Sequence, residues 1–209
     1  WRDFFRSHGV PIQDAGAGIY HLIMAEQGVV GPGTVLALRD SHTPTSGAVG
    51  AFAASLAGGR LSLLALGRYV IDAPKVILFR IEGTLKKGVF GRDVALHING
   101  RVGQRAALDS AAEFAGSYVR SLSMDMRYTL CNMGTEMGAM ATYIQPDAIT
   151  NAWMRGRGNK TFKVYETDPD FRYDKMYEFD VTNLEPQVAV PHAPDNVRSV
   201  KEVEGQHVD

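Results

Sequence analysis

The sequence predicts an α/β fold, and three stretches of apolar side chains support that prediction. Residues 34–39 (TVLALR) form a short apolar run typical of a buried strand, and residues 75–83 (KVILFRIEG) alternate as a half-buried strand does. Ahead of both, residues 18–28 (GIYHLIMAEQG) repeat apolar side chains at helical spacing. The chain has 209 residues and 45% apolar composition, enough for one large domain or two small ones around a real core.

The first strand ends at a group of polar residues. The helix predicted over 18–28 leads through a turn into the strand at 34–39, which is followed directly by Asp40, Ser41 and His42. Open α/β sheets bind ligands at the carboxyl ends of their strands. These three side chains are therefore the first candidates for a functional site.

Helices and strands are predicted to continue through the middle of the chain. The Ala, Gly, Leu and Ser composition of residues 47–66 favours two closely packed helices, and residues 73–74 (Ala-Pro) mark a boundary before the next strand. A loop and then a helix are expected over 88–102, while residues 111–116 (AAEFAG) fit either a strand or a helix. The side chains predicted to face the core from the helix are Val94, Ala95 and Ile98.

Two helices, one polar stretch and one short extended stretch are predicted over residues 124–192. A Met-rich helix is expected over 124–141, and Asp147 is placed to cap a second helix over 148–154. Residues 157–183 are charged and aromatic and are expected to be mostly solvated surface. Two prolines bracket a short extended stretch within residues 185–192.

We expect this organisation to comprise two units of a longer polypeptide. A boundary at residues 73 and 74 separates units 1–73 and 74–192, and residues 193–209 would lead into a further unit. The chain starts at Trp1 without an initiator Met and stops in a stretch that reads like the approach to a strand, which is why we expect a piece of something longer.

Composition excludes several classes of function. The net charge is −1 with 22% charged residues, so no nucleic acid or acidic membrane is expected as a partner. The longest apolar runs, such as residues 61–66 (LSLLAL), are too short to span a bilayer. A single cysteine, Cys131, excludes an internal disulfide framework and fits a reducing compartment, the cytoplasm or a mitochondrial matrix. It also excludes an iron–sulfur site built only from cysteines of this chain.

Acid–base chemistry is the leading interpretation of Asp40 and His42. A carboxylate that holds one nitrogen of a His fixes its tautomer and raises its pKa, so the ring can transfer a proton. The alternative is a capping network, and on residues 40–43 (DSHT) alone that alternative is favoured. The Gly and Ala residues that follow, and the position at the end of a strand, make the acid–base interpretation nearly as favoured as the capping network. His21 lies on an apolar helical face, where a His is more often part of the core.

A second candidate group lies in residues 131–139 (CNMGTEMGA). Glu136 is the only charge between Cys131 and Gln145, and a carboxylate among such residues is costly to bury without a partner. It either pairs with a His or lies exposed. Asn132, four residues earlier, would share its helical face. Cys131 is interpreted as a buried thiol rather than a nucleophile. The histidines expected at the surface are His8, His97, His192 and His207.

Several short motifs occur in a fixed order along the chain. They are Gly18, Ile19 and His21, then DSHT at 40–43, EFAG at 113–116, CNMGTEMGA at 131–139 and AVPH at 189–192. Together they resemble the aconitase superfamily over about the whole chain. Residues 136–139 and the pair Pro146 and Asp147 resemble most closely its 3-isopropylmalate dehydratase and homoaconitase large subunits.

The resemblance implies three-layer α/β/α domains and an iron–sulfur hydro-lyase. The reaction would be the reversible dehydration and rehydration of a hydroxy di- or tricarboxylate such as 3-isopropylmalate, homocitrate, homoisocitrate or citrate. A [4Fe-4S] cluster would act as Lewis acid in the full-length parent. The family's cluster cysteines lie downstream of Asp209, so no metal ligand is expected in this chain, which alone would be inactive. A separate small subunit is a further implied partner.

The resemblance also implies roles for six residues. His21 with Asp40, and His42 with Glu136, would form two His–carboxylate pairs that handle protons. Ser41 would contact the substrate, and Asn132 would lie near the cluster.

One segment departs from the family pattern, and two other hypotheses compete with the enzyme. In residues 55–60 (SLAGGR), Ser55, Ala57 and Arg60 replace two glycines and an acidic residue of the family. A non-catalytic RNA-binding or regulatory protein on the same scaffold is the alternative, and near-neutral charge argues against it. A plain structural domain, in which the His–carboxylate pairs are core networks, is the third hypothesis.

Overall fold

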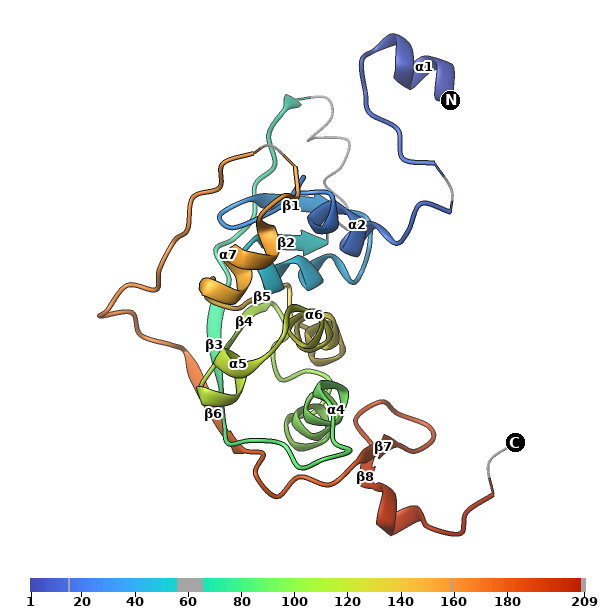
Figure 1. Cartoon of the computed structure of the whole chain (residues 1–209), viewed down its shortest axis with the longest axis vertical. Coiled ribbons are helices and arrows are strands. Elements are labelled where there is room, and N and C mark those ends of the chain that lie inside the picture. Colours follow the sequence, from blue (N-terminus) through green and yellow to red (C-terminus); the bar gives the residue numbers. More distant parts are fainter. Residues whose placement is uncertain (15, 56–65, 159, 208–209) are drawn as a thin grey trace.

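The computed structural model describes residues 1–14, 16–55, 66–158 and 160–207 of the chain (Figure 1). Its N-terminal part contains a small parallel sheet. β1 and β2 pair in register from Val35 opposite Phe52 to Leu38 opposite Ser55. The elements of this part are α1 (Arg2–Ser7), α2 (Tyr20–Glu26), β1 (Val35–Leu38), the 3₁₀ helix η1 (Thr43–Val49) and β2 (Phe52–Ser55).

The predicted helix at 18–28 and strand at 34–39 are confirmed as α2 and β1. The strand is less buried than expected, because Leu36 is buried whereas Val35 is 75% exposed. Two closely packed helices over residues 47–66 are wrong for the described part, which contains η1 and β2 instead. Residues 56–65, and with them Ala57 and Arg60, lie outside the described residues.

The small residues of η1 allow close packing against another strand rather than between two helices. Gly47 accepts a hydrogen bond from the backbone N–H of Ile144 at 3.1 Å, and a Cβ at Gly47 would collide with the carbonyl oxygen of Thr142. Gly50 ends η1 in the left-handed conformation, with φ of 72°. The contact of Gly47 with Thr142 and Ile144 joins the N-terminal part to the second sheet.

Gly47→Ala is therefore expected to lower the free energy of unfolding by about 1–3 kcal/mol, the usual cost of overpacking a tight site. Urea unfolding followed by circular dichroism measures it. The matched control is Ser46→Ala, because the buried hydroxyl of Ser46 has no hydrogen-bond partner among the described residues. Its removal should be neutral or stabilising. Equal stability of Gly47→Ala and the wild type would contradict the packing argument.

The second sheet has four parallel strands in the order β5-β4-β3-β6 (Figure 1). The strand predicted at 75–83 is confirmed as β3, and the ambiguous segment at 111–116 is a strand, β4. The described residues of 157–183 are mostly exposed, as predicted, but the prediction missed β6, whose side chains are exposed or half-buried. The strands are β3 (Lys75–Glu82), β4 (Ser110–Ala115), β5 (Ala141–Tyr143) and β6 (Lys175–Asp180).

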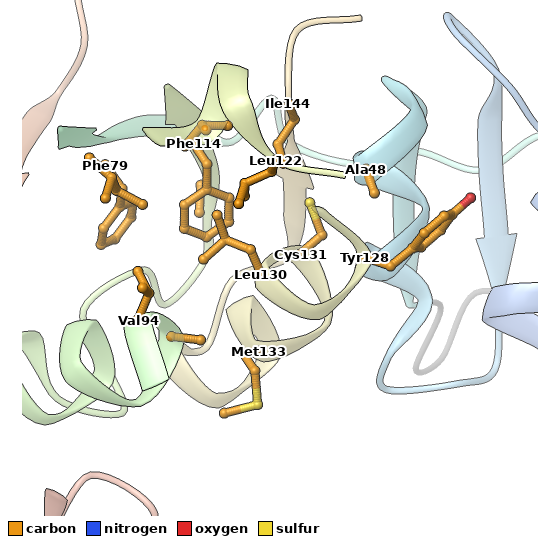
Figure 2. Packing of buried hydrophobic residues seen from close by; sticks show 14 of the residues in the cluster. Ala48, Phe79, Val94, Phe114, Leu122, Tyr128, Leu130, Cys131, Met133 and Ile144 are labelled. Carbon is orange, nitrogen blue, oxygen red and sulfur yellow. The ribbon is translucent and has the colours of Figure 1, made fainter. Parts of the chain in front are cut away.

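Helices pack against this sheet to form the main core. Figure 2 shows Phe79 of β3 and Phe114 of β4 directed toward Val94 and Leu130 on two helices. Val94, Ala95 and Ile98 are buried as predicted. The α/β fold is thus confirmed. The helices are α4 (Gly91–Val102), α5 (Ser117–Ser121), α6 (Met124–Met133) and α7 (Ala148–Met154).

The Met-rich helix is shorter than predicted. α6 ends at Met133, a 3₁₀ turn η2 (Gly134–Met137) follows, and β5 already begins at Ala141. Gly138 ends the turn with φ of 79°, a conformation that glycine adopts without a side-chain penalty. Asp147 caps α7 as predicted, accepting hydrogen bonds from the backbone N–H groups of Ile149 and Thr150.

The C-terminal residues form a hairpin on α4. β7 (Gln187–Ala189) pairs antiparallel with β8 (Val197–Ser199), and a 3₁₀ helix η3 (Val200–Val203) follows. The extended stretch within 185–192 is confirmed. The hairpin crosses the predicted boundary at 192 and 193, and the Asn99 side-chain amide of α4 donates to the Pro194 carbonyl at 3.1 Å. No helix among the described residues is both long and apolar enough to traverse a bilayer.

Candidate active site

The candidate site lies where α2, the loop after β1 and the end of α6 meet. Nδ1 of His21 lies 2.7 Å from Oδ2 of Asp40, and the second oxygen of Asp40 accepts the backbone N–H of His42 at 2.9 Å. One carboxylate therefore holds a side chain from α2 and also stabilises its own turn. The His–carboxylate contact expected from the sequence is present, whereas the expected helix cap is not, because η1 has no side-chain cap hydrogen bond from the described residues and Asp40 bonds its N-cap residue His42 instead.

Asp40 is ionised in this arrangement. Burial by itself would raise the pKa of Asp40, but the hydrogen bond from His21, the backbone N–H of His42 and the charges of the two imidazoles outweigh it. The pKa of Asp40 is consequently lowered below its ordinary value. An ionised Asp40 accepts the proton on Nδ1 of His21, so the other ring nitrogen, Nε2, is the one left to exchange a proton.

His42 is oriented by a backbone carbonyl. Its Nδ1 lies 3.3 Å from the carbonyl oxygen of Asn132, and because a carbonyl only accepts, Nδ1 is the donor. The rings of His21 and His42 are 5.7 Å apart at 42°. The fold thus brings together two imidazoles that are each held through Nδ1.

The expected pair of His42 with Glu136 is not formed. Glu136 is half-buried on η2, and the hydrogen bonds of the described residues join His42 to Asn132 instead. The reason is local: the α-helix ends at Met133, so residues 134–137 follow a tighter turn than the continuous helix that the spacing argument assumed. Ser41 is exposed beside the site.

Three threonines support the site, and of these the sequence analysis considered only Thr43, as part of the group at 40–43. Thr43 donates to the Asp40 carbonyl at 2.6 Å, and Thr45 donates to the His42 carbonyl at 2.6 Å. The Asn132 side chain donates to Thr45 at 3.0 Å, which joins α6 to the loop. Thr135 reaches the Ser41 carbonyl at 3.1 Å. For Thr43 and Thr45 the signal in the sequence was their position directly after His42, because a Thr hydroxyl often donates to a backbone carbonyl three or four residues earlier.

A cleft of about 710 Å³ opens beside these residues, between α2, α6 and α7. His21, Thr45 and Asn132 belong to both the hydrogen-bond network and the cleft wall. The other residues of the wall are Ile19, Leu22, Glu26, Arg92, Asp125, Tyr128, Thr129, Met133, Trp153 and Arg157.

The residues of this chain do not fit an iron–sulfur cluster by themselves. Cys131 is completely buried in the core (Figure 2), and burial raises the pKa of its thiol to about 12. A cluster ligand must be an accessible thiolate. Among the described residues, no three His, Cys, Asp or Glu side chains are grouped so as to hold a metal ion.

Cys131 is accordingly expected to resist thiol reagents in the folded protein. With the pKa of the thiol near 12, a negligible fraction is thiolate at pH 8, and the side chain has no exposed surface. Titration with a chromogenic disulfide should show no reaction at Cys131 in buffer and full reaction in denaturant. Rapid labelling of Cys131 in the folded protein would contradict the buried position.

Three of the four remaining histidines are at the surface as expected, but His97 is not. His8, His192 and His207 are exposed, whereas His97 is half-buried. Its ring lies 6.2 Å from that of Phe179. Burial, with a smaller contribution from Arg101, lowers the pKa of His97. It lies outside the cleft that holds His21.

The sequence profile of the Aconitase family (aconitate hydratase) matches residues 2–209, and the chain belongs to that family. The 3-isopropylmalate dehydratase large subunit of Heliobacterium modesticaldum is 42% identical over 211 residues, covering 100% of this chain and 50% of that relative. The 3-isopropylmalate dehydratase large subunit of Moorella thermoacetica is 40% identical over 205 residues, covering 97% of this chain and 49% of the relative.

A third relative carries a different name. The "Probable methanogen homoaconitase large subunit" of Methanothermobacter thermautotrophicus is 39% identical over 210 residues, covering 100% of this chain and 49% of the relative. The chain thus spans about half the length of the curated relatives it matches. The resemblance drawn from the motifs is confirmed at the level of the family and of its large subunits.

Proposed function

We propose that the complete protein containing this chain is a hydro-lyase that reversibly dehydrates a small hydroxy-carboxylate, with 3-isopropylmalate as the first candidate. The observation that carries the proposal is the contact of 2.7 Å between His21 and Asp40, beside a second oriented imidazole at the carboxyl end of β1. The names of the most similar relatives support the choice of 3-isopropylmalate, and homocitrate or homoisocitrate is the next candidate.

Dehydration needs two proton transfers, and the proposal assigns them to this site. A C–H proton leaves toward a base, and the hydroxyl departs as water after it receives a proton, so that a carbon–carbon double bond forms. His21 and His42 are the proposed proton carriers. Asp40 keeps His21 in one tautomer, and Glu136 is a further carboxylate near the site.

Two further residues complete the proposal for this chain. Ser41 is proposed to contact the substrate, because it is exposed between Asp40 and His42. Asn132 is proposed to lie near the cofactor of the complete protein, at the cleft wall that it shares with His21.

The complete protein is proposed to contain a cofactor and to have a partner, neither of which is supplied by this chain. A [4Fe-4S] cluster, which would supply Lewis-acid chemistry on the hydroxyl group, is proposed to be held by cysteines of the complete protein. A separate small subunit is proposed as a partner, since the relatives are named large subunits. We also propose that residues 1–73 and 74–192 are parts of two family domains and that the protein is cytoplasmic, as the single cysteine of this chain favours.

The test uses the complete protein with its small subunit, reconstituted anaerobically with iron and sulfide. Alkene absorbance is followed with isopropylmaleate, cis-homoaconitate, cis-aconitate and citraconate in turn. Signal loss with isopropylmaleate that depends on the cluster would support the proposal and its first candidate. A bound cluster with no turnover of any of the four would reject the proposed function.

A further inference from the structure

We infer that Arg157 and Tyr128 form a carboxylate-binding subsite on the α7 side of the cleft that also holds His21. The inference rests on the proposed function in one respect: the ligand is a carboxylate of the substrate. Both residues belong to the wall of the cleft, and both contact the side chain of Trp153.

Arg157 is held in place but keeps most of its donors. Its guanidinium carbon lies 3.9 Å from the centroid of the Trp153 ring, and one N–H donates to the Trp153 carbonyl. An arginine carries five N–H donors in a planar fork that matches a carboxylate. Among the described residues, no carboxylate forms an ion pair with Arg157. A half-buried guanidinium with unused donors therefore lines the cleft.

The backbone of Arg157 is fixed against the helix that carries His21. Gly28 lies just after α2 and has φ of 65°. It packs so closely on the backbone of Arg157 that a Cβ at Gly28 would collide with the Arg157 carbonyl oxygen. A Cβ at Gly158 would come within 2.9 Å of the Gly28 carbonyl oxygen, and Lys160 donates to the Val29 carbonyl at 3.1 Å. Position 157 is thus set relative to His21 before any ligand arrives, which reduces the entropy lost on binding.

Tyr128 supplies an independent indication of a ligand. Its side chain is 8% exposed, and its hydroxyl has no hydrogen-bond partner among the described residues. Figure 2 shows the hydroxyl pointing away from the apolar cluster. Burial raises the pKa of Tyr128, so the hydroxyl remains a neutral donor. A buried unpaired hydroxyl is costly, and a carboxylate oxygen would pair with it.

The other charges of the cleft lie at its edge. Glu26, Asp125 and Arg92 also line the cleft, but all three are exposed. Solvent and salt screen exposed charges more than a half-buried guanidinium stacked on an aromatic ring. Arg157 is consequently the group in this cleft best suited to an anion that has lost its hydration shell.

Trp153 reports on the subsite by its fluorescence. The probes are succinate and its monoamide succinamate, added to the complete protein in a Trp1→Phe background, since Trp1 is 93% exposed. The part of the signal that disappears in Trp153→Phe is assigned to the subsite. We expect saturable quenching with a preference for succinate, and its absence would overturn the inference.

Variants assign the binding to Arg157. Arg157→Gln should weaken succinate binding about 10- to 100-fold and remove the preference over succinamate, as loss of a charge-assisted pair does. Tyr128→Phe should weaken it severalfold. The matched control is Arg155→Gln, an exposed arginine two residues away that does not line the cleft, and it should bind as the wild type does. Wild-type affinity in Arg157→Gln would overturn the inference.

Two further comparisons separate the possible failures. Should Arg157→Gln not fold, Arg157→Lys decides, because it keeps the charge and loses the fork. Severalfold weaker binding supports the subsite, and unchanged binding overturns it. Normal turnover with an unchanged KM in Arg157→Gln rejects the subsite alone. If Arg157→Gln loses succinate binding while the wild-type complete protein shows no hydro-lyase turnover, the subsite stands and only the proposed function is rejected.

Discussion

Asp40→Asn is expected to lower the turnover of the complete protein by about 10²- to 10⁴-fold, the usual contribution of a positioned acid–base group. The amide has nearly the shape of the carboxylate, so the turn at His42 can persist, but it cannot accept the Nδ1 proton of His21 as an anion does. His21 would lose the anionic acceptor that fixes its tautomer. Steady-state assays of purified variant and wild type measure the effect.

The control for this substitution is Asp14→Asn, which alters an exposed ion pair with Arg2 and should leave turnover unchanged. Stability adds a second readout. Because folding lowers the pKa of Asp40, its contribution to stability is present above the unfolded-state pKa and is lost as the pH falls through the folded-state pKa. Asp40→Asn should remove that part of the acid sensitivity. A variant with normal turnover would show that the His21–Asp40 contact is only structural.

Arg127→Ala is expected to lower the free energy of unfolding by about 2–3 kcal/mol, the upper range for hydrogen bonds of a charged group, because the buried Arg127 is lost while the partly exposed Asp147 can be solvated. The Arg127 side chain has no exposed surface and lies 2.6 Å from Asp147. It also donates to the hydroxyl of Thr150 at 3.0 Å and to the carbonyls of Leu122 and Arg120 at 3.2 and 3.3 Å. Alanine would leave these acceptors without their donor. Urea unfolding of the 209-residue chain gives the value.

Arg120→Ala is the matched control, because its side chain is exposed and only its backbone carbonyl takes part in the network. It should change stability by no more than about 0.5 kcal/mol. Burial would raise the pKa of Asp147, but the hydrogen bonds from Arg127 and from Thr150 lower it overall. The stability that this pair adds is therefore lost as the pH falls through the folded-state pKa of Asp147. A loss below about 1 kcal/mol in Arg127→Ala would show that the network contributes little.

The parts of the fold that were predictable are those written in local patterns. The helical repeat at 18–28 and the alternation at 75–83 are short-range signals, and both elements formed where expected. β2 and β6 were missed for different reasons. β2 is four residues long and depends on pairing with β1, which composition does not encode. β6 is an edge strand with no buried side chain, so it reads as surface.

The site was predictable in its membership more than in its contacts. His21 and Asp40 meet as expected, and the segment containing Asn132 reaches His42 from 90 positions away. The partner of His42 was wrong, because the exact residue at which a helix gives way to a 3₁₀ turn decides which group faces the ring. Thr45 and Thr135 act through backbone carbonyls, and such contacts depend on the folded turn.

The two contacts of the Asp40 carboxylate have one further consequence. One oxygen faces the His21 ring while the other faces the backbone of His42, so the two cannot be broken independently by rotating the group. A longer acid would not rescue the position either, because Asp40→Glu keeps the charge but moves both oxygens outward by a methylene. Position 40 therefore requires both the negative charge and the length of an aspartate. Asparagine lacks the charge, and glutamate is too long.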